Sequence, residues 1–226
     1  MGNLYISRTI LNSVRTAIDN GISNKDIIVL VSWSGLDRIE NDFETCHLKL
    51  NGLQSYVPNN KVDYDDFIYL WKYLSKEDIR LNSIEHILMT QEFLKNNGVN
   101  FLFFSYQNLF SDDNSNSWLF DAKTKSQIYP DSKKISTIFD VNNSLRWISN
   151  MIDWSNWWFY KNEKISYGGM AEWISDNSPQ NAYTENDEIE FLKFDDCPPP
   201  GHPKIKGHDD FVNQVLKEYI DKIIEK

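Results

Sequence analysis

The sequence predicts an α/β fold in which helices flank a mostly parallel sheet. An amphipathic helical pattern is followed by a short, continuous apolar run, and this succession occurs twice in the first half of the chain. A continuous apolar run is typical of a strand buried on both faces of a parallel sheet. Helices that alternate with such strands define a doubly wound sheet, whose ligands bind at the carboxyl ends of the strands.

The first helix is expected to begin with Asn3 as its N-cap and to end at Gly21. Its apolar stripe repeats every four residues, through Ile6, Ile10, Val14 and Ile18. Residues 27–31 follow at once as a β-branched run, Ile-Ile-Val-Leu-Val. We therefore expect a central parallel strand over residues 27–31.

The same succession recurs further along the chain. Residues 75–78 have the spacing of a capping box, and Asn97-Gly98 ends the helix that the box begins. The predicted inner face of that helix is made of Ile84, Ile87, Leu88, Gln91 and Leu94. Residues 99–104 then form the second buried run.

Three further segments complete the predicted architecture. Residues 142–151 have a helical pattern, whereas residues 154–160 fit either a short strand or a wall of aromatic side chains. The last helix has a broad apolar face of two rows, made of Phe211, Val212, Val215, Leu216, Tyr219, Ile220, Ile223 and Ile224.

Length and composition favour one domain spanning residues 1–226. The 226 residues are 41% hydrophobic and 14% aromatic, enough for a single substantial core, and the polar tracts are too short for linkers. The N-terminus lacks a basic region followed by an apolar run, so it is no secretory signal. The longest apolar runs are far too short to cross a bilayer. We expect a soluble protein, cytoplasmic or otherwise, with no membrane partner.

The charge balance and the cysteines exclude several classes of partner. A formal net charge of −10 and scattered Lys and Arg residues argue against nucleic acid, because that affinity comes from clustered basic side chains. Cys46 and Cys197 have no CxxC pattern and no His at ligand spacing, so no metal site is expected. No glycine-rich phosphate loop occurs, so no cofactor is expected. The sequence predicts no particular oligomeric state.

The turn after the first predicted strand is one candidate for a functional site. Residues 32–38 follow the strand at the end where α/β proteins place functional groups. Ser34 and Gly35 offer a hydroxyl and a backbone N–H to a developing oxyanion. The alternative is an ordinary turn, in which Asp37 pairs with Arg38 or caps a helix.

A proline-rich loop before the last helix is the second candidate. Prolines and glycines fix the backbone of residues 195–208, so the loop is able to hold a side chain in place. His202 lies in this loop, and a neutral imidazole oriented by a carboxylate is the usual general base for a serine nucleophile. Asp195 or Asp196 is expected to orient it.

These segments resemble the SGNH (GDSL) hydrolases. Gly201-His202-Pro203, followed by Gly207-His208 and an apolar helix, is similar to the last block of that family. A poorly described branch, common in phages, is similar in three more places. These are the Gly-Asn turn into an Ile-x-Arg helix at residues 2–8, the Trp-Ser turn at residues 31–38, and the Gly-x-x-Glu-Trp segment at residues 169–173.

The resemblance implies a three-layer, flavodoxin-like sheet and a serine hydrolase. In the family, a serine at the end of the first strand attacks an ester or acyl group, while a glycine N–H and an asparagine amide hold the oxyanion. The glycine corresponds to Gly2, with Asn3 beside it, and the base corresponds to His202. The position of the asparagine falls near Ser34 and Gly35.

The chain departs from the family pattern in three places. No Gly-Asp-Ser strand precedes Gly2, the family asparagine is replaced by the Ser34-Gly35 turn, and Pro199 stands where the family has an aspartate. We therefore expect a sheet without its first strand, through a shortened reading frame, a fragment, or a gap filled by rearrangement or a second chain. Ser34 is the remaining candidate nucleophile.

The leading hypothesis is an SGNH-type ester hydrolase or acyl-transfer domain that acts on an acylated carbohydrate or a small ester, or an inactive descendant of one. The rival is a non-catalytic carbohydrate- or protein-binding domain with an aromatic surface. That surface would be made of the exposed members of the eight Trp and eleven Tyr residues. Trp154, Trp157, Trp158 and Trp173 are expected to serve the core in preference to a surface. A purely structural role, as in a virion, is a third hypothesis.

Overall fold

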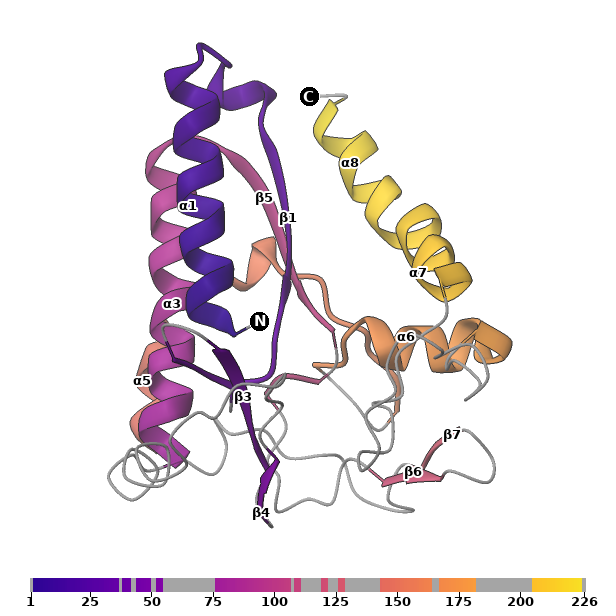
Figure 1. Cartoon of the computed structure of the whole chain (residues 1–226). Helices are drawn as coiled ribbons and strands as arrows, with labels where there is room; N and C mark the ends of the chain where they lie inside the picture. The colour runs from indigo at the N-terminus through magenta and orange to yellow at the C-terminus, as the bar shows by residue number, and fades with distance from the viewer. Residues whose placement is uncertain are drawn as a thin grey trace. The chain divides into compact units, whose positions relative to one another are not determined.

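The chain folds into two compact units. A computed structural model describes residues 2–36, 38–41, 44–49, 52–54, 76–106, 108–110, 119–121, 126–128, 143–163, 167–181 and 205–224. Unit 1 comprises Met1–Phe103 and Asn142–Trp157, and unit 2 comprises Phe104–Val141 and Trp158–Lys226. Among the described residues the chain is mixed α/β and rich in helix (Figure 1).

Unit 1 is built on a parallel pair of strands. β1 (Ile28–Trp33) pairs with β5 (Asn100–Ser105), in which the chain passes into unit 2. Two long helices, α1 (Asn3–Asp19) and α3 (Lys76–Asn96), lie side by side, and α1 also contacts β1 (Figure 1). The predicted succession of helix and parallel strand, repeated once, is confirmed.

Both long helices end at a glycine in the left-handed region, as predicted. The φ angle is +85° at Gly21 and +64° at Gly98. After Gly98, the N–H of Val99 donates to the carbonyl oxygen of Leu94 at 3.0 Å, and α1 is closed by the same pattern of bonds. These bonds satisfy carbonyl groups that the end of a helix otherwise leaves unpaired.

Two details of the first helix and strand differ from the prediction. Gly2, with extended backbone, is the N-cap of α1, and Asn3 is instead the first helical residue and makes no capping bond. The strand is not buried on both faces. Val31 and Trp33 are buried, whereas Leu30 is 36% exposed. Burial thus alternates along the second half of β1, as in a strand with one covered face.

The core of unit 1 combines the buried face of α3 with a stack of aromatic rings. Ile84, Ile87, Gln91 and Leu94 are fully buried, as the periodicity predicts, whereas Leu88, which was predicted for the same face, is half-buried. Phe103 on β5 contacts the rings of Trp33 and Trp157 edge-to-face, with centroid distances of 5.3 and 5.5 Å. Such edge-to-face pairs stabilise a core beyond the burial of their area, by about 0.5–1.5 kcal/mol each.

One of the buried polar residues of this unit, Gln91, forms hydrogen bonds through both ends of its amide. The amide of Gln91 accepts from the N–H of Asp153 at 2.7 Å and donates to the carbonyl of Met151 at 3.2 Å. It thereby ties α3 to the segment after α5 (Asn143–Ser149), a helix that the sequence predicts. For residues 154–160 the sequence left a short strand or a wall of aromatic side chains open. These residues form a 3₁₀ turn (Trp154–Asn156) and two single β-bridges, at Trp157 and Tyr160, so the aromatic wall is the correct alternative.

Two small antiparallel sheets are not predicted by the sequence. In unit 1, β2 (Arg38–Asn41), β3 (Glu44–Lys49) and β4 (Gly52–Gln54) form a three-stranded sheet. In unit 2, β6 (Leu119–Asp121) and β7 (Ser126–Ile128) form a hairpin. β4, β6 and β7 have three residues each, too few for a period of two to stand out. β2 and β3 are longer, but neither carries the continuous apolar run by which β1 and β5 were predicted.

Unit 2 is organised around one phenylalanine of the C-terminal helical segment. Phe211 lies within 5.0–5.6 Å, between ring centroids, of Phe104, Trp158 and Trp173. Trp173 belongs to α6 (Met170–Asn177), which packs against α7 (Ile205–Phe211). The short 3₁₀ turn Pro179–Asn181 also packs against both helices.

The predicted apolar face of the last helix is only partly buried. A π-helical segment (Val212–Leu216) interrupts it before α8 (Lys217–Ile224). Phe211 and Leu216 are buried, but Val212 and Ile224 are 46% and 70% exposed. The wider π turn rotates the residues that follow, so a pattern with period 3.6 no longer marks one face. None of the described helices is both long enough and apolar enough to cross a membrane.

Replacing Gly98 tests the left-handed helix end. Gly98→Ala is expected to lower the free energy of unfolding by about 1–2 kcal/mol, because a Cβ disfavours this backbone conformation. Gly98→Asn is expected to cost less, since asparagine tolerates the left-handed region better. Urea denaturation of the three proteins measures both values. Equal costs for the two variants would show that backbone conformation is not the cause.

Candidate functional site

The turn after β1 is held by the side chain of Asn3. Its Oδ1 accepts from the N–H of Ser34 at 3.0 Å, and its Nδ2 donates to the carbonyl of Ser34 at 3.3 Å, with the carbonyl of Gly35 at 3.5 Å. Asn3 is 1% exposed and Ser34 is 8% exposed. We call these residues, Asn3, Ser34 and Gly35, the Asn3 junction.

An asparagine suits this position for a chemical reason. A backbone N–H and a backbone C=O face the start of α1, and only an amide side chain offers an acceptor and a donor side by side. The turn is also held from α3, where the hydroxyl of Ser83 donates to the carbonyl of Leu36 at 2.8 Å. The first residue of α1 and a residue of α3 thus fix the turn that the sequence singled out.

Two polar atoms of the turn are buried without a hydrogen-bond partner among the described residues. They are the Oγ of Ser34 and the Nε1 of Trp33. An unpaired buried polar group costs about 1–3 kcal/mol, so such groups are rare in folded proteins. Strain, a redox or catalytic role, or a bound water molecule or ion accounts for such groups.

The structure brings four of the predicted site residues together. Gly2 and Asn3 begin α1, and Ser34 and Gly35 form the turn that Asn3 holds. The backbone N–H of Ser34 is bonded to Asn3, so it is not directed at an oxyanion. The remaining predicted residues, Asp37, Asp195, Asp196 and His202, lie outside the described residues. Within the described ranges, no three His, Cys, Asp or Glu side chains gather at a distance suited to a metal ion.

A second polar cluster, in unit 2, surrounds Glu172. This glutamate is completely buried in the first turn of α6. Its Oε2 accepts from the N–H of Gly169 and its Oε1 accepts from the N–H of Asn108, each at 2.8 Å. Beside them, the N–H of Ala171 donates to the carbonyl of Tyr106 at 2.7 Å. We call this group of residues the Glu172 junction.

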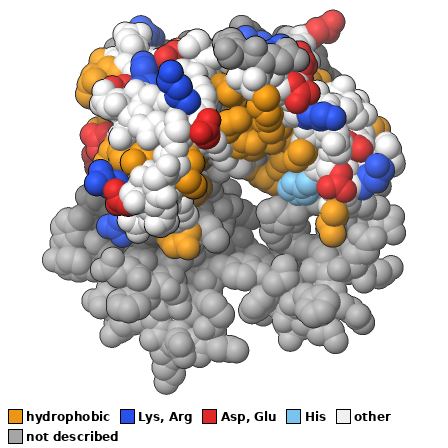
Figure 2. Space-filling model, turned by 90° about the horizontal axis from the view of Figure 1, so that it is seen from above, with side chains coloured by type: hydrophobic (Ala, Val, Ile, Leu, Met, Phe, Trp, Pro, Cys, Tyr) orange, Lys and Arg blue, Asp and Glu red, His pale blue; other side chains and the backbone are white. Residues whose placement is uncertain are grey.

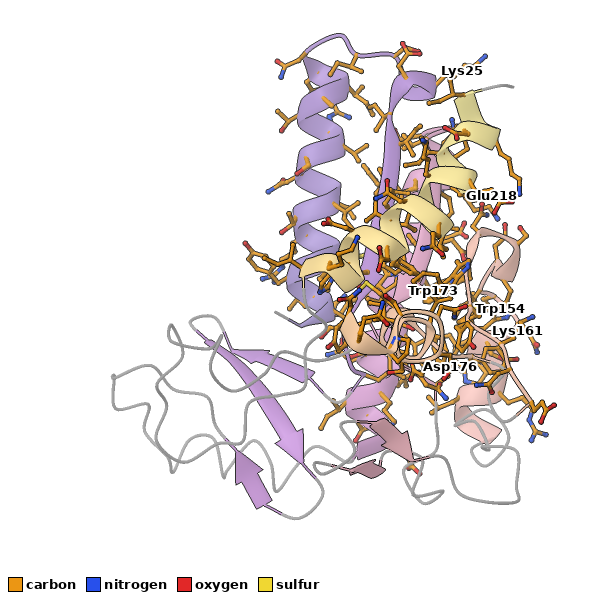
Figure 3. All side chains as sticks on the ribbon, turned by 90° about the vertical axis from the view of Figure 1, so that its right-hand side faces the viewer. Lys25, Trp154, Lys161, Trp173, Asp176 and Glu218 are labelled. Atoms are coloured by element: carbon orange, nitrogen blue, oxygen red, sulfur yellow. The ribbon has the colours of Figure 1, made fainter. Side chains whose placement is uncertain are left out.

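Burial dominates the electrostatics of Glu172. Loss of hydration raises the pKa of its carboxyl to about 7, although the two backbone N–H groups and the start of its own helix stabilise the ionised form. The negative charge of Asp176, on the same helix, raises the pKa further. Figure 3 labels Asp176 and Trp173 on α6.

The residues at the end of β5 also leave polar atoms unpaired. The Oγ of Ser105 and the Oδ1 of Asn108 are buried and have no hydrogen-bond partner within the described part of the chain. Ser105 is the last residue of β5, and Asn108 is the residue whose N–H bonds Glu172. Ser34 thus follows β1, and Ser105 is the last residue of β5. Each of these serines has a buried hydroxyl without a hydrogen-bond partner among the described residues.

Sequence reasoning missed the Glu172 junction, although two signals pointed to it. Functional groups of parallel α/β proteins follow the carboxyl ends of the strands. This rule singled out the turn after residues 27–31, and it applies equally to the residues after 99–104, which include Asn108. Gly169-x-x-Glu172 has the spacing of the second half of a capping box, in which a glutamate reaches back to the N–H that precedes the helix. Burial of the carboxylate has no local signature in the sequence.

Charged side chains of both signs lie on the described surface. In the described part of the face shown in Figure 2, blue and red side chains are interspersed, and no broad basic area is visible there.

No known family model matches the chain, and no curated protein or solved structure is significantly similar to it. The function is therefore inferred from the residues themselves.

Removing the Asn3 amide tests the Asn3 junction. Asn3→Ala leaves the buried N–H of Ser34 unpaired, so the free energy of unfolding is expected to fall by about 1–3 kcal/mol. Asn12→Ala is the matched control, because Asn12 lies exposed on the same helix. Its effect should stay within about 0.5 kcal/mol. Equal losses in urea denaturation of the two variants would contradict the role of Asn3.

The pKa of Glu172 predicts how stability depends on pH. Its pKa is about 7 in the folded protein, above the usual 4.5 of a glutamate that the unfolded chain has. Between these two pH values the folded state therefore keeps a proton that the unfolded state releases. The free energy of unfolding of the wild type should therefore fall as the pH rises through this window, by on the order of 3 kcal/mol, and level off above it.

The variant Glu172→Gln isolates this effect, because it cannot titrate. Urea denaturation at about pH 5 and about pH 8 gives the difference in unfolding free energy between wild type and variant, and that difference should change by on the order of 3 kcal/mol. A difference that is the same at both pH values would show that Glu172 titrates normally.

Proposed function

We propose that the chain is an SGNH-type ester hydrolase or acyl-transfer domain that acts on an acylated carbohydrate or a small ester. In this proposal, the β1–β5 pair is part of a three-layer, flavodoxin-like sheet. The Asn3 junction is the observation that carries the proposal. Ser34, whose buried hydroxyl has no hydrogen-bond partner among the described residues, follows a parallel strand in a turn that two helices fix.

The support is physical as well as positional. Functional groups of parallel α/β sheets follow the carboxyl ends of strands, and Ser34 has this position. Catalysis also requires preorganised groups, since a displacement of about 1 Å costs roughly a hundredfold in rate. Two buried side-chain contacts to a single turn supply such preorganisation.

The proposed reaction assigns a role to each residue. The Oγ of Ser34 attacks the carbonyl carbon of the ester while the imidazole of His202 takes its proton, and Asp195 or Asp196 orients the imidazole. Gly2 and Gly35 provide N–H groups to the oxyanion, and Asn3 positions the turn. His202 then protonates the leaving alkoxide, and water hydrolyses the acyl-serine by the same steps.

The rival binding function has less support in the structure. Its aromatic surface was expected from the exposed Trp and Tyr side chains, of which Trp147 and Tyr5 are 55% and 48% exposed. Trp157 and Trp173, which were expected in the core, are 7% and 8% exposed. Trp154 and Trp158 are half-buried. The rings of all four contact other aromatic rings, as core residues do.

A fluorophosphonate probe tests the proposed function on the full chain. The probe should form one covalent adduct, at Ser34, detected by mass spectrometry of the intact protein and of its peptides. Ser34→Ala should lose the adduct and the hydrolysis of p-nitrophenyl acetate. His202→Ala should lose most of both, by about a hundredfold or more, because the hydroxyl is weak without a base.

The serine of β5 provides the matched control. Ser105→Ala also removes a buried, unpaired hydroxyl next to the sheet, but should keep the adduct at Ser34. An adduct at another serine would overturn the assignment of Ser34. Absence of an adduct together with saccharide binding would favour the binding domain instead.

A further inference from the structure

The Glu172 junction holds residues 108–110, which follow β5, against the start of α6. Both segments belong to unit 2, and Asn108 lies 64 positions before the glutamate that binds its N–H. Ring contacts join the three hydrogen bonds of the junction, since Phe110 lies 6.1 and 6.2 Å, between centroids, from Phe159 and Tyr167. Among these contacts, Glu172 supplies the only carboxyl group.

This carboxyl group is buried without a cationic partner among the described residues. Glu172 is completely buried, and the charge that acts on it is that of Asp176, which has the same sign. Two backbone N–H groups stabilise the ionised form, but burial is the larger effect and opposes ionisation. The folded protein therefore keeps the proton at pH values at which a hydrated glutamate has lost it.

Other charged or titratable groups lie on three segments near α6. α7, which packs against α6, carries Lys206, His208, Asp209 and Asp210. The segment before α6, which bonds Asp176 through two side chains, carries Tyr160, Lys161, Glu163 and Tyr167. The segment after β5 carries Tyr106. The 3₁₀ turn Pro179–Asn181 and β7, which also pack against α6, carry none.

We propose that Glu172 makes this contact a pH-sensitive switch, which holds residues 108–110 firmly against α6 at mildly acidic pH and opens most readily at neutral pH and above. Opening brings the carboxylate into water, where its charge is hydrated, so opening is linked to the loss of a proton. Every contact of the switch lies within unit 2, and the proposal does not depend on the proposed reaction.

The pH range of the switch follows from the two protonation equilibria. The pKa of Glu172 is about 7 in the closed contact and returns to the usual 4.5 when the carboxyl is hydrated. Between these pH values the open form releases a proton that the closed form keeps, so rising pH favours opening. Above the upper value both forms are ionised, and the effect levels off.

Hydrogen exchange of single backbone amides in the full chain measures this opening. The informative amides are those of Asn108 and Gly169, which donate to Glu172. After correction for the intrinsic pH dependence of exchange, their opening constants should rise by about tenfold or more between about pH 5 and about pH 8. In Glu172→Gln, which cannot titrate, they should change by less than about twofold.

The amide of Ser178 is the control at the other end of the same helix. It donates to the carbonyl of Ile174 at 2.8 Å. The neighbouring Asp210 stays ionised over the range tested, because hydrogen bonds from Ser178 and Lys206 hold the pKa of its carboxyl below the usual value. The opening constant of Ser178 should therefore be the same at both pH values. A rise equal to that of Asn108 would show that the contact does not open locally, and would overturn the proposal.

Two variants separate Glu172 from other titrating groups. Glu163→Gln removes the charge of an exposed glutamate in unit 2 and should keep the wild-type rise. Glu172→Gln keeps His208, so a rise that persists in this variant would belong to another group and overturn the role of Glu172. If Glu172→Gln does not fold, the wild type decides alone, because equal opening of Asn108 and Gly169 at both pH values contradicts the switch.

Discussion

The parallel pairing of β1 with β5 is the constraint on which the rest of the structure depends. Parallel strands cannot be joined by a hairpin, so the chain must cross over, and α3 forms the last part of that crossover. The chain remains buried where it leaves each strand, at Ser34 after β1 and at Asn108 after β5. The buried backbone N–H groups of these two residues need hydrogen-bond partners, and the side chains of Asn3 and Glu172 supply them from other elements.

These two side chains solve the same problem with different chemistry. Asn3 is neutral and pairs with both a donor and an acceptor, so it stabilises its turn over a wide pH range. Glu172 accepts from two N–H groups, but its charge is buried, so its contribution depends on protonation. The Oγ of Ser34 and the Oδ1 of Asn108 belong to residues held by these contacts, and neither atom has a hydrogen-bond partner among the described residues.

The sequence predicts those parts of the fold that are governed by local periodicity. The two long helices, their glycine ends, the two parallel strands and the helix near residue 145 follow from spacing alone. The antiparallel strands do not, because they are very short or lack a continuous apolar run. The π-helical segment does not either, because it breaks the 3.6-residue period. The turn at Ser34 was identified as a site, but its dependence on Asn3 is a contact across 31 positions that no local pattern encodes.

The central claim is that the Asn3 junction holds Ser34 where a histidine from the proline-rich loop can activate it. A crystal structure of the full chain with a phosphonate inhibitor bound tests this most directly. The account predicts a phosphonate bonded to the Oγ of Ser34, with an imidazole nitrogen of His202 about 3 Å from that oxygen. A structure in which His202 lies far from the turn, with Ser34 unmodified, would contradict it.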